Sequence, residues 1–242
     1  MRHSRILATL LIASGGQAVA ADRIAVDLEL VLAADTSQSM DEEERRVQVD
    51  GYARAFRDRD VVASILGGPY GKIAVTYVEW SDEQRTIVPW MLIRDAASAN
   101  AFASAVANAP IYQHLDGTNI SGALVFGARS IRDNAFDGAR RVIDISGDGE
   151  NNSDTPPDGI RDAIVSEDTT INGLPLNIEE GPDPYFEKSA EAKLLDERAA
   201  SIEAYYRDHV IGGPGAFLLV ANSMRDFGRM IRLKLLREIA AR

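Results

Sequence analysis

The stretch DLELVLAADTSQSM, residues 27–40, joins an apolar run to a loop of oxygen-bearing side chains. The apolar run extends over residues 25–34, has the composition of a buried β-strand, and stops abruptly at Asp35. Ser37 and Ser39 follow at alternate positions. In an extended chain, alternate side chains point the same way, so these oxygens can converge on one point. The stretch therefore predicts a strand that ends in a nest of oxygen ligands.

Helix capping is a second explanation for the same loop. Acidic residues follow it, which suits the positive end of a helix dipole, and a helix is predicted over residues 41–56. Ser37 or Ser39 can cap this helix, with Glu42 or Glu43 completing a capping box. These residues by themselves leave both explanations open.

Strand and helix signals alternate along the rest of the chain. This alternation predicts an α/β domain with a mostly parallel sheet, helices on both faces, and the 25–34 strand at the centre. Pro89 favours an edge position for the strand over 85–93, which is expected to run antiparallel. The other strands are predicted at 72–81, at 169–178 with an interruption at Asn172-Gly173, and at 216–222. One more strand begins at residue 140 and runs into a polar loop that ends at residue 152. The other helices are predicted at 96–107, around the apolar stripe Ile120, Leu124 and Ile131, at 158–165, within 193–208, and at 223–241.

Two more polar groups are expected near Asp35. Ligands of open parallel sheets gather at the carboxyl ends of the strands. Asp148 follows one strand and Thr118 precedes a helix, so both are expected on the same rim as Asp35. Neighbouring glycines let the backbone turn sharply at Thr118 and Asp148. Carboxylate and hydroxyl oxygens are hard ligands, which suit Mg²⁺, Mn²⁺ or Ca²⁺ and do not suit zinc or copper.

Three segments together resemble a von Willebrand factor type A (VWA) domain: DLELVLAADTSQSM, DGTNISGAL and RRVIDISGDGENN. The resemblance covers essentially the whole chain after residue 20 and is nearest to a family of exported bacterial proteins, domain of unknown function 1194. It implies a three-layer, Rossmann-like fold with one antiparallel edge strand. It also implies a metal-ion-dependent adhesion site (MIDAS) made by Asp35, Ser37, Ser39, Thr118 and Asp148. Gly147 stands where the family commonly has a threonine, a departure that is expected to loosen the loop of Asp148.

The resemblance implies metal-dependent recognition of another protein. Two carboxylates and three hydroxyls leave a divalent cation, Mg²⁺ by preference, with one position open for an Asp or Glu of the partner. The alternatives are a Mg²⁺-dependent hydrolase or phosphoryl-processing enzyme that uses the same oxygens, and a structural domain with an incidental metal site. Ser37 occupies the place of the second carboxylate of a D-x-D motif, and neither serine has the G-x-S-x-G setting of a hydrolase. We therefore predict a binding domain that is not an enzyme, with Glu150 and His114 at the rim or behind the ligands.

Residues 1–20 read as a secretory signal peptide. Arg2 and Arg5 precede a short apolar run, and small residues lead to a cleavage position before Ala21. We expect a single domain over residues 21–242, with 179–192 as a surface loop or insertion. No other stretch is apolar for long enough to span a bilayer, so no transmembrane segment is expected and the location is periplasmic or secreted.

Composition excludes several classes of function. The chain has 242 residues and no cysteine, which excludes thiol catalysis and thiolate metal sites. Its net charge is −11, and removal of the signal peptide, with two arginines and no acidic residue, makes it more negative still. Such a charge disfavours nucleic-acid binding. The helix over 223–241 is nevertheless basic; we prefer a solvated face on a packed helix over a contact with an anionic membrane or partner.

Overall fold

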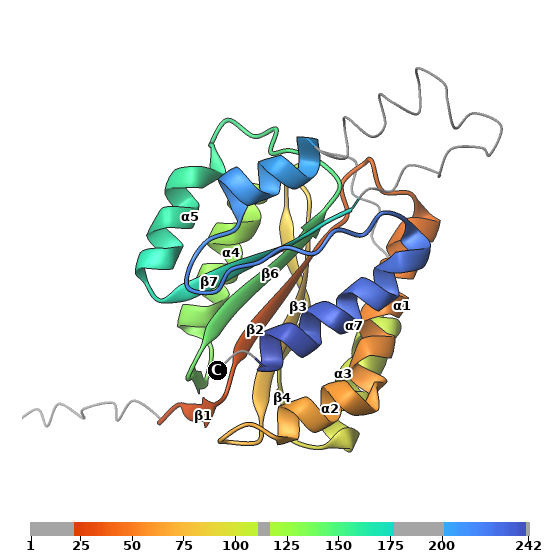
Figure 1. Ribbon diagram of the computed structural model, residues 1–242, viewed down its shortest axis with the longest axis vertical. Helices are drawn as coiled ribbons and strands as arrows, with labels where there is room; N and C mark the ends of the chain where they lie inside the picture. The colour runs from red at the N-terminus through yellow and green to blue at the C-terminus, as the bar shows by residue number, and fades with distance from the viewer. Residues whose placement is uncertain (1–21, 111–116, 177–200, 241–242) are drawn as a thin grey trace, which may run out of the picture.

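A five-stranded sheet forms the centre of the computed structural model, which describes residues 22–110, 117–176 and 201–240 (Figure 1). The strands are β2 (Glu29–Asp35), β3 (Ile73–Trp80), β4 (Gln84–Ile93), β6 (Arg141–Gly147) and β7 (Thr169–Pro175). Their order is β4-β3-β2-β6-β7, with β4 antiparallel to β3 and the other neighbouring pairs parallel. Outside this sheet, β1 (Ile24–Val26) and β5 (Phe136–Gly138) form a short parallel pair.

Strand β2 lies in the middle of the sheet, as its apolar sequence predicts. All seven of its residues are buried, and it pairs with β3 on one side and β6 on the other. The predicted strand over 25–34 is divided into β1 and β2. The division falls at Asp27, whose carboxylate accepts hydrogen bonds from the backbone N–H groups of Tyr70 (2.9 Å) and Lys72 (3.1 Å) in the turn before β3.

Helices cover both faces of the sheet and give a three-layer α/β fold (Figure 1). One face carries α1 (Glu42–Arg57), α2 (Arg59–Leu66), α3 (Ala96–Ala107) and α7 (Met224–Ala240), and the other carries α4 (Ile120–Asp133), α5 (Pro157–Ser166) and the π-helical turn η1 (Tyr206–Val210). Each face has its own hydrophobic core. Phe56, Phe102 and Phe227 are buried in the first, and Leu124 and Tyr206 in the second. The predicted fold class is confirmed, including the antiparallel edge strand that contains Pro89.

Two predictions about the last strands are wrong. Asn172-Gly173 does not interrupt β7, which pairs with β6 at both positions, because the Asn172 side chain finds buried hydrogen-bond partners. Residues 216–222 do not form a regular strand and make only isolated bridges, from Leu218 to Gly173 of β7 and from Ala221 to Leu176 just after it. The ladder is broken because the Asn172 side chain captures the backbone N–H of Phe217, at 3.1 Å, and because Pro175 has no N–H to donate.

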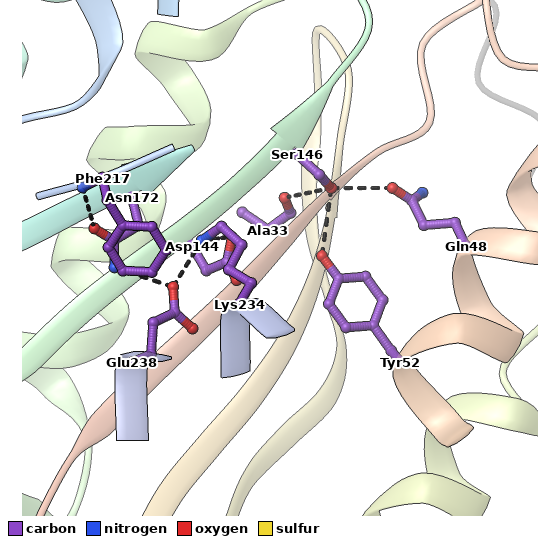
Figure 2. A network of polar contacts seen from close by, with 9 residues as sticks. All are labelled: Ala33, Gln48, Tyr52, Asp144, Ser146, Asn172, Phe217, Lys234 and Glu238. Carbon is purple, nitrogen blue, oxygen red and sulfur yellow. Dashed lines mark hydrogen bonds and ion pairs between the residues drawn. The ribbon is translucent and has the colours of Figure 1, made fainter. Parts of the chain in front are cut away.

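The expectation of a solvated basic face on the last helix fails at Lys234. This side chain is fully buried in α7, and its Nζ lies 2.6 Å from both Asp144 Oδ1 of β6 and Glu238 Oε1 (Figure 2). Asn172 of β7 donates to the same Glu238 oxygen at 3.0 Å. The Phe217 ring lies against the cluster, with Nζ 5.2 Å from its centroid. Lys234 therefore fixes α7 to the sheet, because the two buried carboxylates need its charge.

Some predictions fall outside the described residues. The signal peptide at 1–20 and the segment at 179–192 lie there, as does the first part of the helix expected within 193–208. A single domain over 21–242 stays a prediction. Within the part of the chain that the structure describes, no helix is both long and apolar enough to cross a membrane.

Candidate metal centre

Asp35 is the last residue of β2 and is completely buried. Its Oδ1 accepts the backbone N–H of Ser37 at 2.8 Å, which turns the chain immediately after the strand. Its backbone carbonyl accepts the side-chain amide of Gln48, in α1, at 2.9 Å. The carboxylate is therefore held by its own loop, and the backbone behind it is held by the helix that follows.

The structure decides between the two explanations of this loop. The N-cap of α1 is Asp41, whose carboxylate accepts the backbone N–H of Glu44 at 2.8 Å. Glu44 completes the capping box by accepting the backbone N–H of Asp41 at 2.8 Å. The capping prediction for Ser37 or Ser39 is thus wrong, because Asp41 does the capping. The hydroxyls of Ser37 and Ser39 are therefore not used for capping and can serve as ligands.

A chain of hydrogen bonds joins this loop to Asp148. The hydroxyls of Ser37 and Ser39 lie 3.1 Å apart, and Ser39 Oγ donates to Asp148 Oδ1 at 2.8 Å. The backbone N–H of Asp148 points to Asp35 Oδ2 at 3.4 Å. Ser37 is buried, whereas Ser39 is exposed and Asp148 is half-buried. Four of the five predicted ligands therefore meet at the ends of β2 and β6, with an open side at Ser39.

Thr118 reaches the same rim from the start of α4. Its backbone N–H donates to Asn152 Oδ1 at 2.7 Å, and the backbone N–H of Asn152 donates back to the Thr118 carbonyl at 2.9 Å. The Thr118 hydroxyl oxygen lies 3.6 Å from the point where a side chain at Gly149 would begin. Gly117 beside it leaves room for the Asn152 side chain, because a Cβ there would stand 2.6 Å from Asn152 Oδ1. Asn152 thus positions Thr118 next to the Asp148 loop.

The carboxylates of Asp35 and Asp148 repel each other in this centre. Burial raises the pKa of Asp35 to about 7, and the negative charge of Asp148 is the next largest cause. Hydrogen bonds from Ser37 and from the backbone of Asp148 oppose the shift. Two carboxylates held together in this way favour either a shared proton or a cation between them.

Gln48 and Arg45 also support the site, although sequence reasoning did not single them out. Gln48 Oε1 accepts the hydroxyl of Ser146 at 3.0 Å, so the contact of Gln48 with Asp35 extends into a buried polar network that includes Tyr52 (Figure 2). The buried guanidinium of Arg45 donates to the backbone carbonyl of Met40 in the loop. Both residues read as polar positions of an amphipathic helix, and no motif distinguishes them from its solvent-facing residues.

The predicted rim residues have different outcomes. Glu150 is exposed, and its carboxylate accepts the hydroxyl of Ser201 at 3.2 Å. His114 lies outside the described residues. Across the described ranges, no three histidine or acidic side chains come together as a metal-binding group.

The donor set nevertheless fits a hard divalent cation. Its groups are two carboxylates and three hydroxyls, which is the ligand chemistry of Mg²⁺, Mn²⁺ and Ca²⁺. A cation bound here would offset the repulsion between the buried Asp35 carboxylate and Asp148, which favours cation binding.

Several solved structures share the fold. The structure of proximal thread matrix protein 1 from the mussel byssus, with a zinc-occupied MIDAS motif, matches with a TM-score of 0.54 and 17% identity, over 91% of this chain and 49% of that one. A von Willebrand factor type A structure from Catenulispora acidiphila matches with a TM-score of 0.53 and 14% identity, over 89% of this chain and 43% of that one. The pilus adhesin SpaC from Lactobacillus rhamnosus GG matches with a TM-score of 0.54 and 11% identity, over 89% of this chain and 30% of that one. The chain thus spans about half or less of the length of these structures.

The sequence itself gives the family. No curated protein sequence matches the chain. The family model described as "Protein of unknown function (DUF1194)" matches residues 25–242, which is most of the chain. The protein has a VWA-like fold and belongs to the DUF1194 family.

Proposed function

We propose that this protein recognises a partner protein through a divalent cation, preferentially Mg²⁺, held by Asp35, Ser37, Ser39, Thr118 and Asp148. One observation carries the proposal: the buried Asp35 carboxylate is held beside Asp148, and the two charges repel. A cation removes that repulsion and uses the hydroxyls that helix capping leaves available. The likeness to a VWA structure with a zinc-occupied MIDAS motif supports the proposal at the level of the fold.

The chemistry of the ligands points to an acidic partner. Three of the five side chains are neutral, so the two carboxylates only balance the charge of the cation, and five ligands leave a six-coordinate Mg²⁺ one open position that an anionic oxygen can fill. The exposed side of the site lies at Ser39, where an Asp or Glu carboxylate can approach. The relatives of similar fold include an adhesin and a thread matrix protein, which is consistent with a binding role. No observation favours the enzyme alternative, so we do not propose it.

Partner capture should depend on both the metal and the exposed ligands. We expect the immobilised protein to retain a partner in Mg²⁺, to release it in chelator, and to recapture it when Mg²⁺ is restored. Asp148→Asn should lose capture because it halves the carboxylate charge, whereas Ser37→Ala should weaken it less, since water can replace a neutral ligand. Arg46→Gln, which alters an exposed ion pair on α1, serves as the control. Capture that persists both in chelator and in Asp148→Asn would show that the partner surface lies elsewhere.

We also propose that the protein is exported to the periplasm or secreted. The support is the pattern of residues 1–20, with Arg2 and Arg5 before an apolar run and small residues before Ala21. Expressed with residues 1–20 in a Gram-negative host, the protein should be recovered from the periplasm with Ala21 as its first residue. N-terminal sequencing of each fraction checks this, and a mainly uncleaved chain in the cytosol contradicts it.

A further inference from the structure

We propose that the hydroxyl of Tyr206 is a further positioning group of the cation site and donates a hydrogen bond to Asp35 Oδ2 when the ion is bound. This inference rests on the proposed function, because it concerns the same cation. Tyr206 belongs to η1, far from the three ligand segments in sequence. Neither the motifs nor the match to known structures assigns it a role.

Gly147 shows how close the hydroxyl lies to the site. A Cβ built on Gly147 would stand 2.5 Å from the Tyr206 hydroxyl oxygen, 2.8 Å from Asp35 Oδ2 and 3.0 Å from a ring carbon of Trp80. The space beside Gly147 is therefore filled by the phenol and the carboxylate together. The absence of a side chain at this position is what lets the phenol approach Asp35.

A second glycine makes room for the ring. Gly173, in the neighbouring strand β7, would carry a Cβ only 3.0 Å from the Tyr206 ring. Tyr206 also starts a π-helical turn, in which the Ile211 N–H donates to the Tyr206 carbonyl at 2.9 Å. Such turns are rare and occur frequently at functional sites. Two glycines and an irregular turn thus bring one phenol to the rim.

The hydroxyl lacks a partner in the described structure. Tyr206 is fully buried, and its Oη makes no hydrogen bond. A buried polar group without a partner is costly, and it calls for a specific explanation. Burial and the negative charges of Asp35 and Asp148 raise the pKa of Tyr206 well above its usual range, so the phenol keeps its proton. The group is therefore a donor that lies beside the Asp35 carboxylate.

The positioning role follows from the way the Asp35 carboxylate is held. Its Oδ1 accepts the 2.8 Å hydrogen bond from the backbone N–H of Ser37, and its Oδ2 accepts the long 3.4 Å hydrogen bond from the backbone N–H of Asp148. A hydrogen bond from Tyr206 would hold Oδ2 and stabilise the ionised carboxylate that the cation needs. Groups that orient metal ligands in this way typically contribute 10-fold to 100-fold to metal affinity.

Tyr206→Phe removes only the hydroxyl and tests the role directly. Calorimetric titration with Mg²⁺ or Mn²⁺ near neutral pH should show about 10-fold weaker binding than wild type. The stability of the metal-free protein should not fall, because the lost hydroxyl has no partner there. Metal addition should also perturb the ultraviolet absorption of tyrosine in wild type and much less in the variant. Tyr77→Phe is the matched control, since Tyr77 has an equally buried, unpartnered hydroxyl in the opposite core.

The outcomes separate this inference from the proposed function. If wild type binds metal and Tyr206→Phe binds it equally well, Tyr206 has no positioning role although the site stands. If Tyr206→Phe instead loses stability without losing affinity, its hydroxyl is merely structural and the inference is wrong. If wild type binds no divalent cation, the site and the inference fall together.

A second variant checks the geometry without metal. Gly147→Ala should destabilise wild type, because the new methyl group meets the phenol oxygen at 2.5 Å. In the Tyr206→Phe background the same change should cost less, because the closest contact is gone. A double-mutant cycle of unfolding measures this coupling. Additive effects would contradict the close approach of Tyr206 to Gly147.

Discussion

Replacing Lys234 by methionine should lower the free energy of unfolding by about 3–5 kcal/mol, because it leaves Asp144 and Glu238 buried together without their cation. Both carboxylates are inaccessible to solvent, so water cannot replace the lost ammonium group. Chemical denaturation of the metal-free protein measures the change. For a chain of this size, the melting temperature should fall by roughly 6–20 °C.

The pH dependence of this loss is a second readout. Burial and repulsion from Glu238 already raise the pKa of Asp144 to about 7, and Lys234 lowers it. Removing Lys234 should raise the pKa of Asp144 further above its value in the unfolded chain. A group with a raised pKa stabilises the fold while it is protonated and loses that contribution as the pH rises through its folded pKa. The loss should therefore be larger at about pH 8 than at about pH 5.

Two further variants control the interpretation. Arg229→Met, on the exposed side of the same helix, should change stability by less than about 0.5 kcal/mol. The triple variant Lys234→Met, Asp144→Asn and Glu238→Gln should regain most of the lost stability, because no buried charge is left unpaired. A cost below about 1 kcal/mol for Lys234→Met alone would contradict a buried ion-pair cluster in this position.

Replacing Asp35 by asparagine should reduce the affinity for Mg²⁺ by at least about 100-fold. Loss of a group that only orients a metal ligand costs up to about 100-fold, and Asp35 is proposed as a ligand itself. The substitution removes the buried negative charge and keeps the shape, and the amide oxygen can still accept the N–H of Ser37. The fold should therefore survive. Titration calorimetry measures the affinity, and circular dichroism confirms the fold.

The same variant should stabilise the protein in chelator. With the pKa of Asp35 raised to about 7, its ionisation costs stability as the pH rises through that value, and asparagine removes this cost. The gain should therefore appear at about pH 8 and vanish at about pH 4. Glu29→Gln is a suitable control, because Glu29 is a buried carboxylate at the opposite end of β2 and should leave metal affinity unchanged. Unchanged metal binding in Asp35→Asn would remove Asp35 from the site.

Local sequence patterns determined most of the fold. β2, β3 and β4 follow from runs of β-prone residues, and Pro89 predicts the edge position of β4, because the strand must tolerate a missing N–H donor. The ligand candidates were also readable, because each lies next to the end of a strand or the start of a helix. Their placement needs only the rule that parallel strands bring their carboxyl ends to one edge.

Tertiary contacts decided what local patterns left open. The cap of α1 is local instead: Asp41 and Glu44 are three residues apart and form a capping box, a pattern that the sequence itself carries. Asn172 stays within β7, because Glu238 and the backbone of Phe217 satisfy its side chain. The outcome at Asn172 is not visible in β-propensity, which does not register partners that are distant in sequence.

Lys234 and Tyr206 show most clearly what the sequence alone could not determine. Lys234 reads as one more basic residue of an amphipathic helix, yet it is buried, because Asp144 lies 90 positions earlier in the chain and only folding brings it to 2.6 Å. Tyr206 belongs to no motif, and two glycines on neighbouring strands bring it beside Asp35. The sequence by itself determined the order of the elements and the loops that carry the oxygens, because these depend on local periodicity. Only the tertiary structure decided which buried charges and hydroxyls face one another, because their burial is tolerated only where distant partners meet.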